Sequence, residues 1–289
     1  MRSVTVKLVA IDLDGTLLNK DHRISDENMN ALSAASEHHL VAIATGRAVM
    51  DVQAMLGGRV SLPVIASNGA TIFDHSGQLL SETPLSQETA EQLIAYAENH
   101  RLYYEATTAH HLLIPFDGKQ IIREELDVSD KRLSKESAQK AWARAEVQFA
   151  QAGWQPRSEI RSLIRSGHAV YKLLFFSFNK QVLTELREQF ANQTDLSCTY
   201  SLGYTLEFNS SKCDKGKGIR QLAGHYGINQ KDTIVIGDSD NDLPMFHAAA
   251  TRVAMGNAIA SIKEISSFVT LDCNHHGVAY SLKNQLALY

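Results

Sequence analysis

Two carboxylates separated by one residue are the first candidates for chemistry in this sequence. Asp12 and Asp14 stand in residues 12–17 (DLDGTL), directly after an apolar run that ends at Ile11. Two bare carboxylates so close together repel each other, and their desolvation at the end of a buried strand is costly unless a cation joins them. A hard cation with oxygen ligands, above all Mg²⁺, answers both problems. The alternative is a tight turn without chemistry, in which Gly15 only reverses the backbone.

A second acidic segment argues against that alternative. Residues 237–242 (GDSDND) follow the apolar run 233–236 and contain Asp238, Asp240, Asn241 and Asp242. A helix N-terminus favours one or two acidic side chains, and it leaves the others unexplained. This segment therefore predicts a second wall of a cation site.

Candidate hydrogen-bond donors for a phosphoryl group lie elsewhere in the chain. Thr45 and Gly46 follow the apolar run 40–44, and Lys215 precedes Gly216. A hydroxyl, a backbone N–H and a compact ammonium are suitable donors to the non-bridging oxygens of a phosphate. Lys212 and Lys217 are close by in the sequence, so the choice of Lys215 stays open on spacing alone.

Four short apolar runs deliver these side chains. They are residues 7–12 (KLVAID), 40–46 (LVAIATG), 63–69 (PVIASNG) and 233–238 (TIVIGD), and helical stretches at 25–38, 48–56 and 217–226 fall between them. Near-continuous apolar runs that alternate with helices are typical of a doubly wound α/β fold with a parallel sheet. In such sheets the ligand site lies at the carboxyl ends of the strands, where Asp12, Thr45, Asn68 and Asp238 would meet.

The middle of the chain breaks this rhythm. Amphipathic helices are expected at 86–100 and 134–151, with strands at 102–108, 112–116, 171–178 and 198–209. Mixed helices and hairpins indicate an α+β insertion at 84–207, which leaves a discontinuous core formed by 1–83 and 208–289.

Composition limits the class of protein. With 289 residues, 44% hydrophobic and 21% charged, the chain is long enough for two globular domains. A formal net charge of −4 offers no basic surface for nucleic acid. Residues 1–11 lack a signal-peptide pattern, no apolar run is long enough to span a bilayer, and the three cysteines form no CxxC pair. We therefore expect a cytoplasmic protein with no membrane partner.

The motifs together resemble those of haloacid dehalogenase-type phosphatases, and specifically the Cof-like, class IIB hydrolases. The resemblance covers nearly the whole chain, and its motifs occur in order: residues 12–18 (DLDGTLL), 44–47 (ATGR), 215–216 (KG) and 237–242 (GDSDND). Residues 67–70 (SNGA) are similar to the family's segment before its cap domain. The resemblance implies a Rossmann-like core, and it implies that 84–207 form a cap that sets substrate specificity.

The resemblance also implies a mechanism. Asp12 would attack phosphorus, and Asp14 would protonate the leaving alcohol and later deprotonate water. Mg²⁺ would be held by the Asp12 carboxylate, the Asp14 carbonyl and Asp238. The residues implied to complete or orient the metal shell are Asp242 and Asn241. The residues implied to bind phosphate are Thr45, Gly46, Lys215 and Asn241, with Arg47 as a candidate substrate contact.

Two other functions use the same aspartates. A phosphomutase would return the phosphoryl group to its substrate, and a receiver-like module would be phosphorylated to switch a partner surface. The large insertion disfavours both. The substrate stays open among small phosphate esters such as sugar phosphates, pyridoxal 5′-phosphate or flavin mononucleotide, and so does the oligomeric state. Conceivable contacts in the insertion are His110, His111, Arg123, Lys172 and Tyr204.

Overall fold

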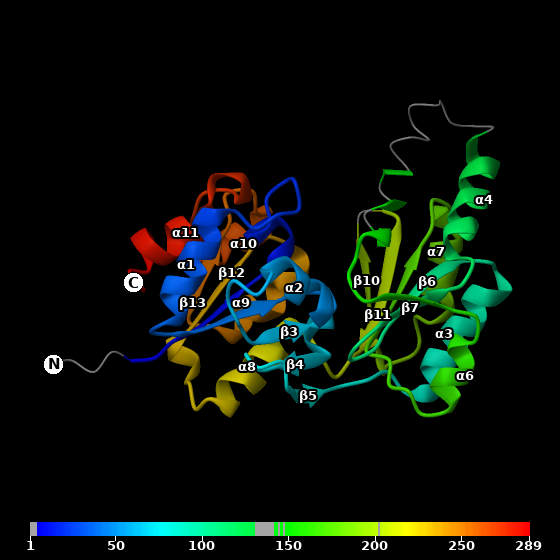
Figure 1. Cartoon of the computed structure of the whole chain (residues 1–289), viewed down its shortest axis with the longest axis horizontal. Helices are drawn as coiled ribbons and strands as arrows, with labels where there is room; N and C mark the ends of the chain where they lie inside the picture. Colours follow the sequence, from blue (N-terminus) through cyan, green and yellow to red (C-terminus); the bar gives the residue numbers. More distant parts are fainter. Residues whose placement is uncertain (1–4, 131–141, 144, 147, 202) are drawn as a thin grey trace. The chain divides into compact units, whose positions relative to one another are not determined.

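The chain divides into two compact units. The computed structural model describes residues 5–130, 142–143, 145–146, 148–201 and 203–289 (Figure 1). Met1–Glu82 and Cys213–Tyr289 form one unit, called the core unit, and Thr83–Lys212 form the other, called the inserted unit. The inserted unit continues past residue 207 because β11 (Thr205–Ser210) stays paired with its neighbour up to Ser210.

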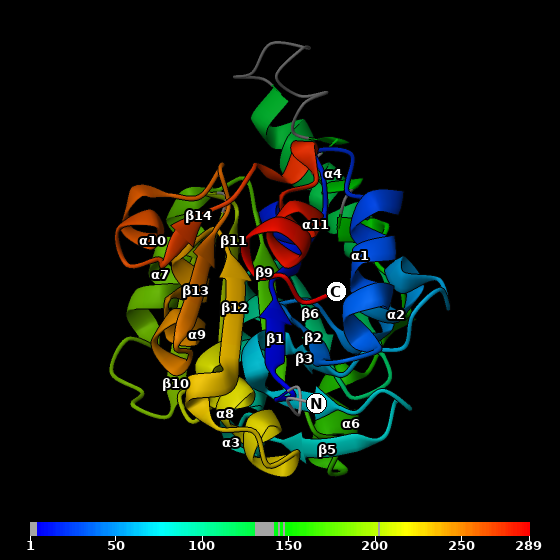
Figure 2. The ribbon, with the colours of Figure 1, turned by 90° about the vertical axis from the view of Figure 1, so that its left-hand side faces the viewer.

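The core unit is built on one eight-stranded sheet. The strand order is β14-β13-β12-β1-β2-β3-β4-β5, parallel from β14 to β3 and antiparallel at β4 and β5 (Figure 2). The strands are β1 (Leu8–Ile11), β2 (Leu40–Ala44), β3 (Val64–Ala66), β4 (Thr71–Phe73), β5 (Leu79–Glu82), β12 (Thr233–Gly237), β13 (Thr251–Ala254) and β14 (Phe268–Val269). Every residue of β1 and β12 is buried, as their apolar composition requires. The predicted doubly wound α/β sheet is confirmed.

Helices cover the sheet of the core unit. They are α1 (Asp26–Ser36), α2 (Val49–Leu56), α8 (Lys215–His225), α9 (Leu243–Ala248), α10 (Ala260–Glu264) and α11 (Gly277–Tyr280). In this arrangement α1 packs against α11, and α8 packs against α9. The helix expected at 217–226 begins earlier, because the Asp214 side chain accepts a hydrogen bond from the Lys217 N–H and caps the first turn. The cap places Lys215 at the start of α8.

The inserted unit contains a six-stranded sheet in the order β10-β11-β9-β6-β7-β8. Its strands are β6 (Tyr103–Thr107), β7 (Leu112–Pro115), β8 (Trp154–Arg157), β9 (Lys172–Phe176), β10 (Leu196–Ser201) and β11, and its helices include α3 (Gln87–Asn99), α4 (Gly118–Asp130), α6 (Ile160–Arg165) and α7 (Lys180–Gln189). The strand expected at 198–209 is instead two antiparallel strands, because Gly203 adopts a positive φ and lets the chain reverse. Part of the helix expected at 134–151 lies outside the described residues.

One acidic side chain of the inserted unit is buried in the sheet. Glu105 on β6 is 1% exposed, and it accepts hydrogen bonds from the Tyr103 hydroxyl at 2.9 Å and the Gln151 amide at 3.2 Å. Burial raises the pKa of Glu105 to about 7, against the hydrogen bond from Tyr103 and the charge of Lys172. Lys172 in turn pairs with Glu207 at 3.3 Å. Glu105 therefore titrates near neutrality in the folded protein.

This group should make stability fall as pH rises. The folded-state pKa of Glu105 is above its unfolded value, so its contribution is fully present below about pH 4.5 and lost as pH passes 7. We expect Glu105→Gln, which stays neutral, to remove roughly 3 kcal/mol of this pH dependence at most. Urea unfolding between pH 5 and pH 8 measures it, with Glu88→Gln on the exposed face of α3 as the control. Parallel curves for wild type and Glu105→Gln would contradict the assignment.

None of the helices in the described part of the chain is long and apolar enough to cross a membrane.

Candidate active site

Three carboxylates meet at the carboxyl ends of two neighbouring strands. Asp12 follows β1, and Asp238 and Asp242 follow β12, which is paired with β1. The Asp12 N–H donates to the Ile236 carbonyl at 2.9 Å, which extends the pairing of β1 and β12 to Asp12. Among the described residues these three aspartates form the group whose ligand oxygens all lie within 4.8 Å of one another. The two acidic segments of the sequence are thus brought together.

Gly15 permits the close approach of the two segments. Its φ is 80°, and a Cβ atom at this position would lie 2.5 Å from Asp238 Oδ2. Any side chain here would be strained and would collide with the carboxylate. The next residue, Thr16, donates its hydroxyl to Asp238 Oδ1 at 3.2 Å.

A buried lysine joins two of the carboxylates. Lys215 is 1% exposed, and its Nζ lies 2.6 Å from Asp12 Oδ1 and 2.7 Å from Asp242 Oδ1. Of the two neighbouring lysines, Lys212 is exposed and Lys217 pairs with Asp214 at 3.4 Å on the surface. Lys215 is therefore the lysine of this segment that reaches the carboxylates.

The charges of this cluster are not balanced. Burial and the charge of Asp242 raise the pKa of Asp12 well above its ordinary value, although Lys215 opposes them. Burial and Asp242 also raise the pKa of Asp238, to about 6. Burial lowers the pKa of Lys215, but Asp12 and Asp242 outweigh it and the net shift is upward. Three acids against one ammonium leave room for a further positive charge.

One oxygen of the cluster is suited to a cation. Asp12 Oδ2 is buried and has no hydrogen-bond partner in the described part of the chain, whereas buried carboxylate oxygens are normally satisfied. A Mg²⁺ ion bound by Asp12 and Asp238 would satisfy this oxygen, and carboxylates are the ligands that this ion takes in proteins. The residues present therefore fit a hard divalent cation.

Asp242 has both oxygens engaged within the protein. Its Oδ1 accepts from Lys215, and its Oδ2 accepts from the backbone N–H groups of Asp238 at 2.8 Å and Ser239 at 3.1 Å. Asn241 Oδ1 accepts from the Ser239 hydroxyl at 2.8 Å. In this arrangement Asp242 holds the loop and the lysine, and Asn241 points its amide oxygen to Ser239 and not to the carboxylates.

Arg47 is held by two acids. Its Nε and one terminal nitrogen each lie 2.7 Å from an oxygen of Asp14, and its other terminal nitrogen lies 2.6 Å from Asp51 on α2. Desolvation raises the pKa of Asp14, but the hydrogen bonds and charge of Arg47 outweigh it, so the pKa lies below its ordinary value. Asp14 is therefore paired with Arg47 and ionised here, apart from the three clustered carboxylates.

The Thr45 segment is supported by a strained turn. Ser67, Asn68 and Gly69 have φ values of 50°, 57° and 88°, a left-handed run that is costly for the first two residues. The N–H groups of Ser67 and Asn68 donate to the carbonyls of Arg47 and Thr45, both at 2.9 Å. A Cβ on Gly46 would lie 2.9 Å from Asn68 Oδ1, so the two segments touch. The two hydrogen bonds hold this turn against the loop that carries the Thr45 hydroxyl.

Several polar residues of this region could not be identified from the sequence. Thr16 and Asp51 contact Asp238 and Arg47, and Asn257, after β13, bonds to Gly15 and Asp238. Asn257 is far from the other motifs in sequence, and a single Gly-Asn pair carries no signal. Only the pairing of β13 with β12 brings it to the same end of the sheet.

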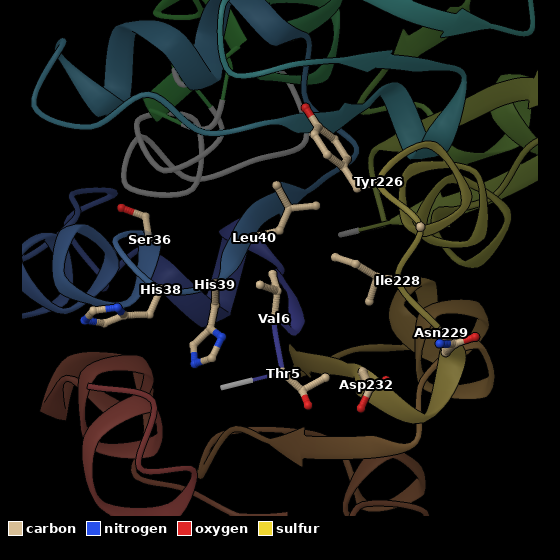
Figure 3. A pocket seen from close by; sticks show the side chains of 11 residues that line it. Thr5, Val6, Ser36, His38, His39, Leu40, Tyr226, Ile228, Asn229 and Asp232 are labelled. Atoms are coloured by element: carbon tan, nitrogen blue, oxygen red, sulfur yellow. The ribbon is translucent and has the colours of Figure 1, made fainter. Parts of the chain in front are cut away.

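A cavity of about 520 Å³ lies at the opposite end of the strands (Figure 3). Its lining includes Val6, Leu40 and Asp232, which precede or begin β1, β2 and β12, together with His38 and His39. His39 is 8% exposed, and its Nδ1 accepts from the Lys7 N–H at 3.3 Å. The cavity holds none of the predicted site residues.

Comparisons with known proteins agree with the fold and the motifs. The model of the haloacid dehalogenase-like hydrolase family matches residues 9–282. Over 283 residues the chain is 41% identical to a 5-amino-6-(5-phospho-D-ribitylamino)uracil phosphatase of Bacillus subtilis, covering 98% of this chain and 99% of that protein. A second phosphatase of the same organism is 35% identical, covering 97% of this chain and 100% of that protein.

Solved structures give the same result. A haloacid dehalogenase-like hydrolase from B. subtilis superposes with a TM-score of 0.80 at 35% identity, covering 96% of this chain and 99% of that chain. A protein from Thermotoga maritima superposes with a TM-score of 0.76 at 27% identity, covering 96% of this chain and 97% of that chain. The chain belongs to the haloacid dehalogenase-like hydrolase family, as its motifs predicted. It is a phosphatase by class.

Proposed function

We propose that this phosphatase hydrolyses small phosphomonoesters through a phosphoaspartyl intermediate on Asp12, with Mg²⁺ as its cofactor. The observation that carries the proposal is the buried Oδ2 of Asp12, which has no partner among the residues described, in a carboxylate whose other oxygen is held by Lys215. Such a carboxylate has a fixed orientation and one reactive side. Mg²⁺, when bound, neutralises the carboxylates and the substrate phosphate and so permits the approach of an anion.

The metal ligands in this proposal are the carboxylates of Asp12 and Asp238, with the backbone carbonyl of Asp14. Asp242 serves the site through Lys215 and through the N–H groups of the 238–239 loop, because both of its oxygens are engaged there. Residues that orient ligands in this way are commonly as important as the ligands themselves.

The chemical step divides between two aspartates. An oxygen of Asp12 forms a bond to phosphorus as the ester P–O bond breaks. Asp14 is a carboxylate while Arg47 binds it, so in this proposal it separates from Arg47, takes up a proton from solvent and gives that proton to the leaving alcohol. Water, deprotonated by Asp14, then displaces Asp12 and releases inorganic phosphate. Because Arg47 binds both oxygens of Asp14, we assign Arg47 to positioning Asp14 as the carboxylate that deprotonates water, in preference to the direct substrate contact considered from sequence.

The donors to the phosphoryl oxygens are the Thr45 hydroxyl, the Gly46 N–H and Lys215. Developing charge on the transferring group is best stabilised by donors that are already fixed in place. Thr45 is 1% exposed at the end of β2, and its Oγ1 accepts from the Arg47 N–H at 3.1 Å, which leaves its own proton available to donate. Asn241 completes this set in the proposal through its Nδ2 donors, while its Oδ1 accepts from the Ser239 hydroxyl.

The inserted unit is proposed to act as the cap that selects the leaving group. The 41% identical relative is a phosphatase of a phosphorylated ribitylamino-uracil, which favours a polyol phosphate on a heterocycle within the predicted class of small esters. Among the conceivable contacts, Lys172 pairs with Glu207, and Arg123 stacks on Trp142. A cytoplasmic location stays a prediction.

Phosphate release across a panel of esters tests the function. The panel contains 5-amino-6-(5-phospho-D-ribitylamino)uracil, flavin mononucleotide, pyridoxal 5′-phosphate and sugar phosphates. We expect turnover with Mg²⁺ and a loss on the order of 10³-fold or more with chelator, because the uncompensated carboxylates repel the substrate. Equal rates with chelator would contradict the metal requirement, and dependence on an added bisphosphate would favour a phosphomutase.

A further inference from the structure

Asn257 connects three separate segments at the edge of the site. It lies in the loop after β13, and its Nδ2 donates to the Gly15 carbonyl at 2.8 Å and lies 3.4 Å from Asp238 Oδ2. Its Oδ1 accepts from the Cys273 N–H at 2.9 Å. A single side-chain amide thus uses both donors and its acceptor.

The orientation of this amide is fixed by its partners. Because the Cys273 N–H can only donate, it must face the Asn257 oxygen, and the nitrogen must then face Gly15 and Asp238. Both of these partners are acceptors, so the reversed amide would leave three contacts unfavourable. The loop itself is held in place, since the Ile259 N–H donates to the Asp238 carbonyl at 3.0 Å.

The two acceptors, the Gly15 carbonyl and the Asp238 carboxylate, belong to two segments that approach each other closely. Gly15 is one residue past Asp14, and a Cβ on Gly15 would lie 2.5 Å from Asp238 Oδ2. Among the described residues, the other side-chain bond to the Asp238 carboxylate is the weak one from the Thr16 hydroxyl at 3.2 Å. A side chain that binds both the Gly15 carbonyl and Asp238 sets the separation of the two segments.

We propose that Asn257 is a positioning residue of the metal site, which fixes the Asp238 carboxylate and the Gly15 turn relative to each other. This inference rests on the proposed function, because Asp238 is a ligand only if the site holds Mg²⁺. Mg²⁺ demands near-ideal octahedral geometry, whereas Ca²⁺ accepts irregular oxygen ligands. Loosening Asp238 should therefore cost Mg²⁺ more than Ca²⁺.

Asn274 offers a matched control. Its Oδ1 accepts from the Lys20 N–H at 2.9 Å, so it joins the chain after β1 to the same 272–275 loop that Asn257 contacts. It bonds to no carboxylate of the site in the described structure. Asn274→Ala removes a comparable surface bridge and leaves Asp238 untouched.

The experiment measures Mg²⁺ and Ca²⁺ binding by calorimetry without substrate. We expect Asn257→Ala to weaken Mg²⁺ binding roughly 10- to 100-fold and Ca²⁺ binding less, while Asn274→Ala binds both ions as the wild type does. Asn257→Asp keeps the acceptor for Cys273 and loses the donors. We expect its added negative charge to strengthen the binding of both ions, but the ratio of Mg²⁺ affinity to Ca²⁺ affinity should still fall. This second variant carries the comparison if Asn257→Ala does not fold.

The outcomes separate two failures. Wild type that binds Mg²⁺, with an unchanged ion ratio in the Asn257 variants, overturns the positioning role and leaves the proposed function standing. If Asn257→Ala and Asn274→Ala weaken the binding of both ions equally, the loop structure is lost in general, and this result also overturns the positioning role. Wild type that binds no Mg²⁺ overturns the metal site and the inference together.

Discussion

Asp12→Asn is expected to abolish phosphate release while the protein stays folded. The amide cannot attack phosphorus, so the rate should fall by a factor on the order of 10⁴ or more. The fold should tolerate the change because Asp12 is one of three crowded acids and its pKa is already raised by burial. Lys215 keeps its contact with Asp242. In chelator, we expect the free energy of unfolding to stay within about 1 kcal/mol of the wild-type value.

Three measurements check this prediction together. Phosphate release gives the rate, acid quenching of the reaction with substrate traps any aspartyl phosphate, and urea unfolding reports stability. Asp240→Asn is the matched control, since Asp240 is exposed in the same acidic segment and lies outside the three-carboxylate group. Turnover by Asp12→Asn above about 1% of wild type would place the nucleophile elsewhere. A folded, inactive Asp12→Asn beside an active control would support covalent catalysis.

The fold of the core unit could be predicted from the sequence because the candidate site residues stand at the ends of its apolar strands. The runs at 7–12, 40–46, 63–69 and 233–238 are apolar until the residue at which the sheet ends, so the same residues mark both the strand end and the site. The short strands β4, β5, β13 and β14 have no such apolar run, and they were not anticipated. Their place follows from tertiary pairing with β3 and β12.

The partners of the site residues were less accessible to sequence reasoning. Residue type and spacing identified Asp12, Asp238 and Lys215 as candidates, but not which oxygen faces which nitrogen. That Asp242 turns both oxygens to Lys215 and the loop, and that Arg47 binds Asp14 and Asp51, depends on side-chain directions. The position of Asn257 at the site depends on the order of the strands alone. Hydrogen-bond partners distant in sequence are set by packing, for which a single sequence has no periodic signal.

Lys215→Met should cost both activity and stability, because it removes the buried ammonium that pairs with Asp12 and Asp242 and keeps most of the length of the side chain. Breaking a buried ion pair leaves its acids uncompensated, which is expected to lower the free energy of unfolding by about 3–5 kcal/mol in chelator. Loss of a fixed donor to the phosphoryl group should lower the rate by roughly 10²- to 10³-fold or more. Urea unfolding and phosphate release measure the two effects.

The neighbouring lysines supply the controls for this variant. Lys212 is exposed and Lys217 makes a surface pair with Asp214, so Lys212→Ala and Lys217→Ala should change stability by less than about 1 kcal/mol. If either of them lost activity as Lys215→Met does, the assignment of the phosphate-binding lysine would move to that residue.

The cause of the instability can be separated from simple loss of packing. Asp12 already has a raised pKa with Lys215 present, and removal of the ammonium should raise it further. A raised carboxyl pKa gives stability at low pH that is lost as pH rises, so the deficit of Lys215→Met should be larger at pH 8 than at pH 5. Mg²⁺ should also narrow the deficit, because the carboxylates without the ammonium carry more negative charge, bind the cation more tightly than the wild-type site does and gain more stability from it. A stability deficit that changes with neither pH nor Mg²⁺ would instead mean that Lys215 stabilises the fold through the packing of its methylene chain. The three carboxylates would then not act as one electrostatic unit.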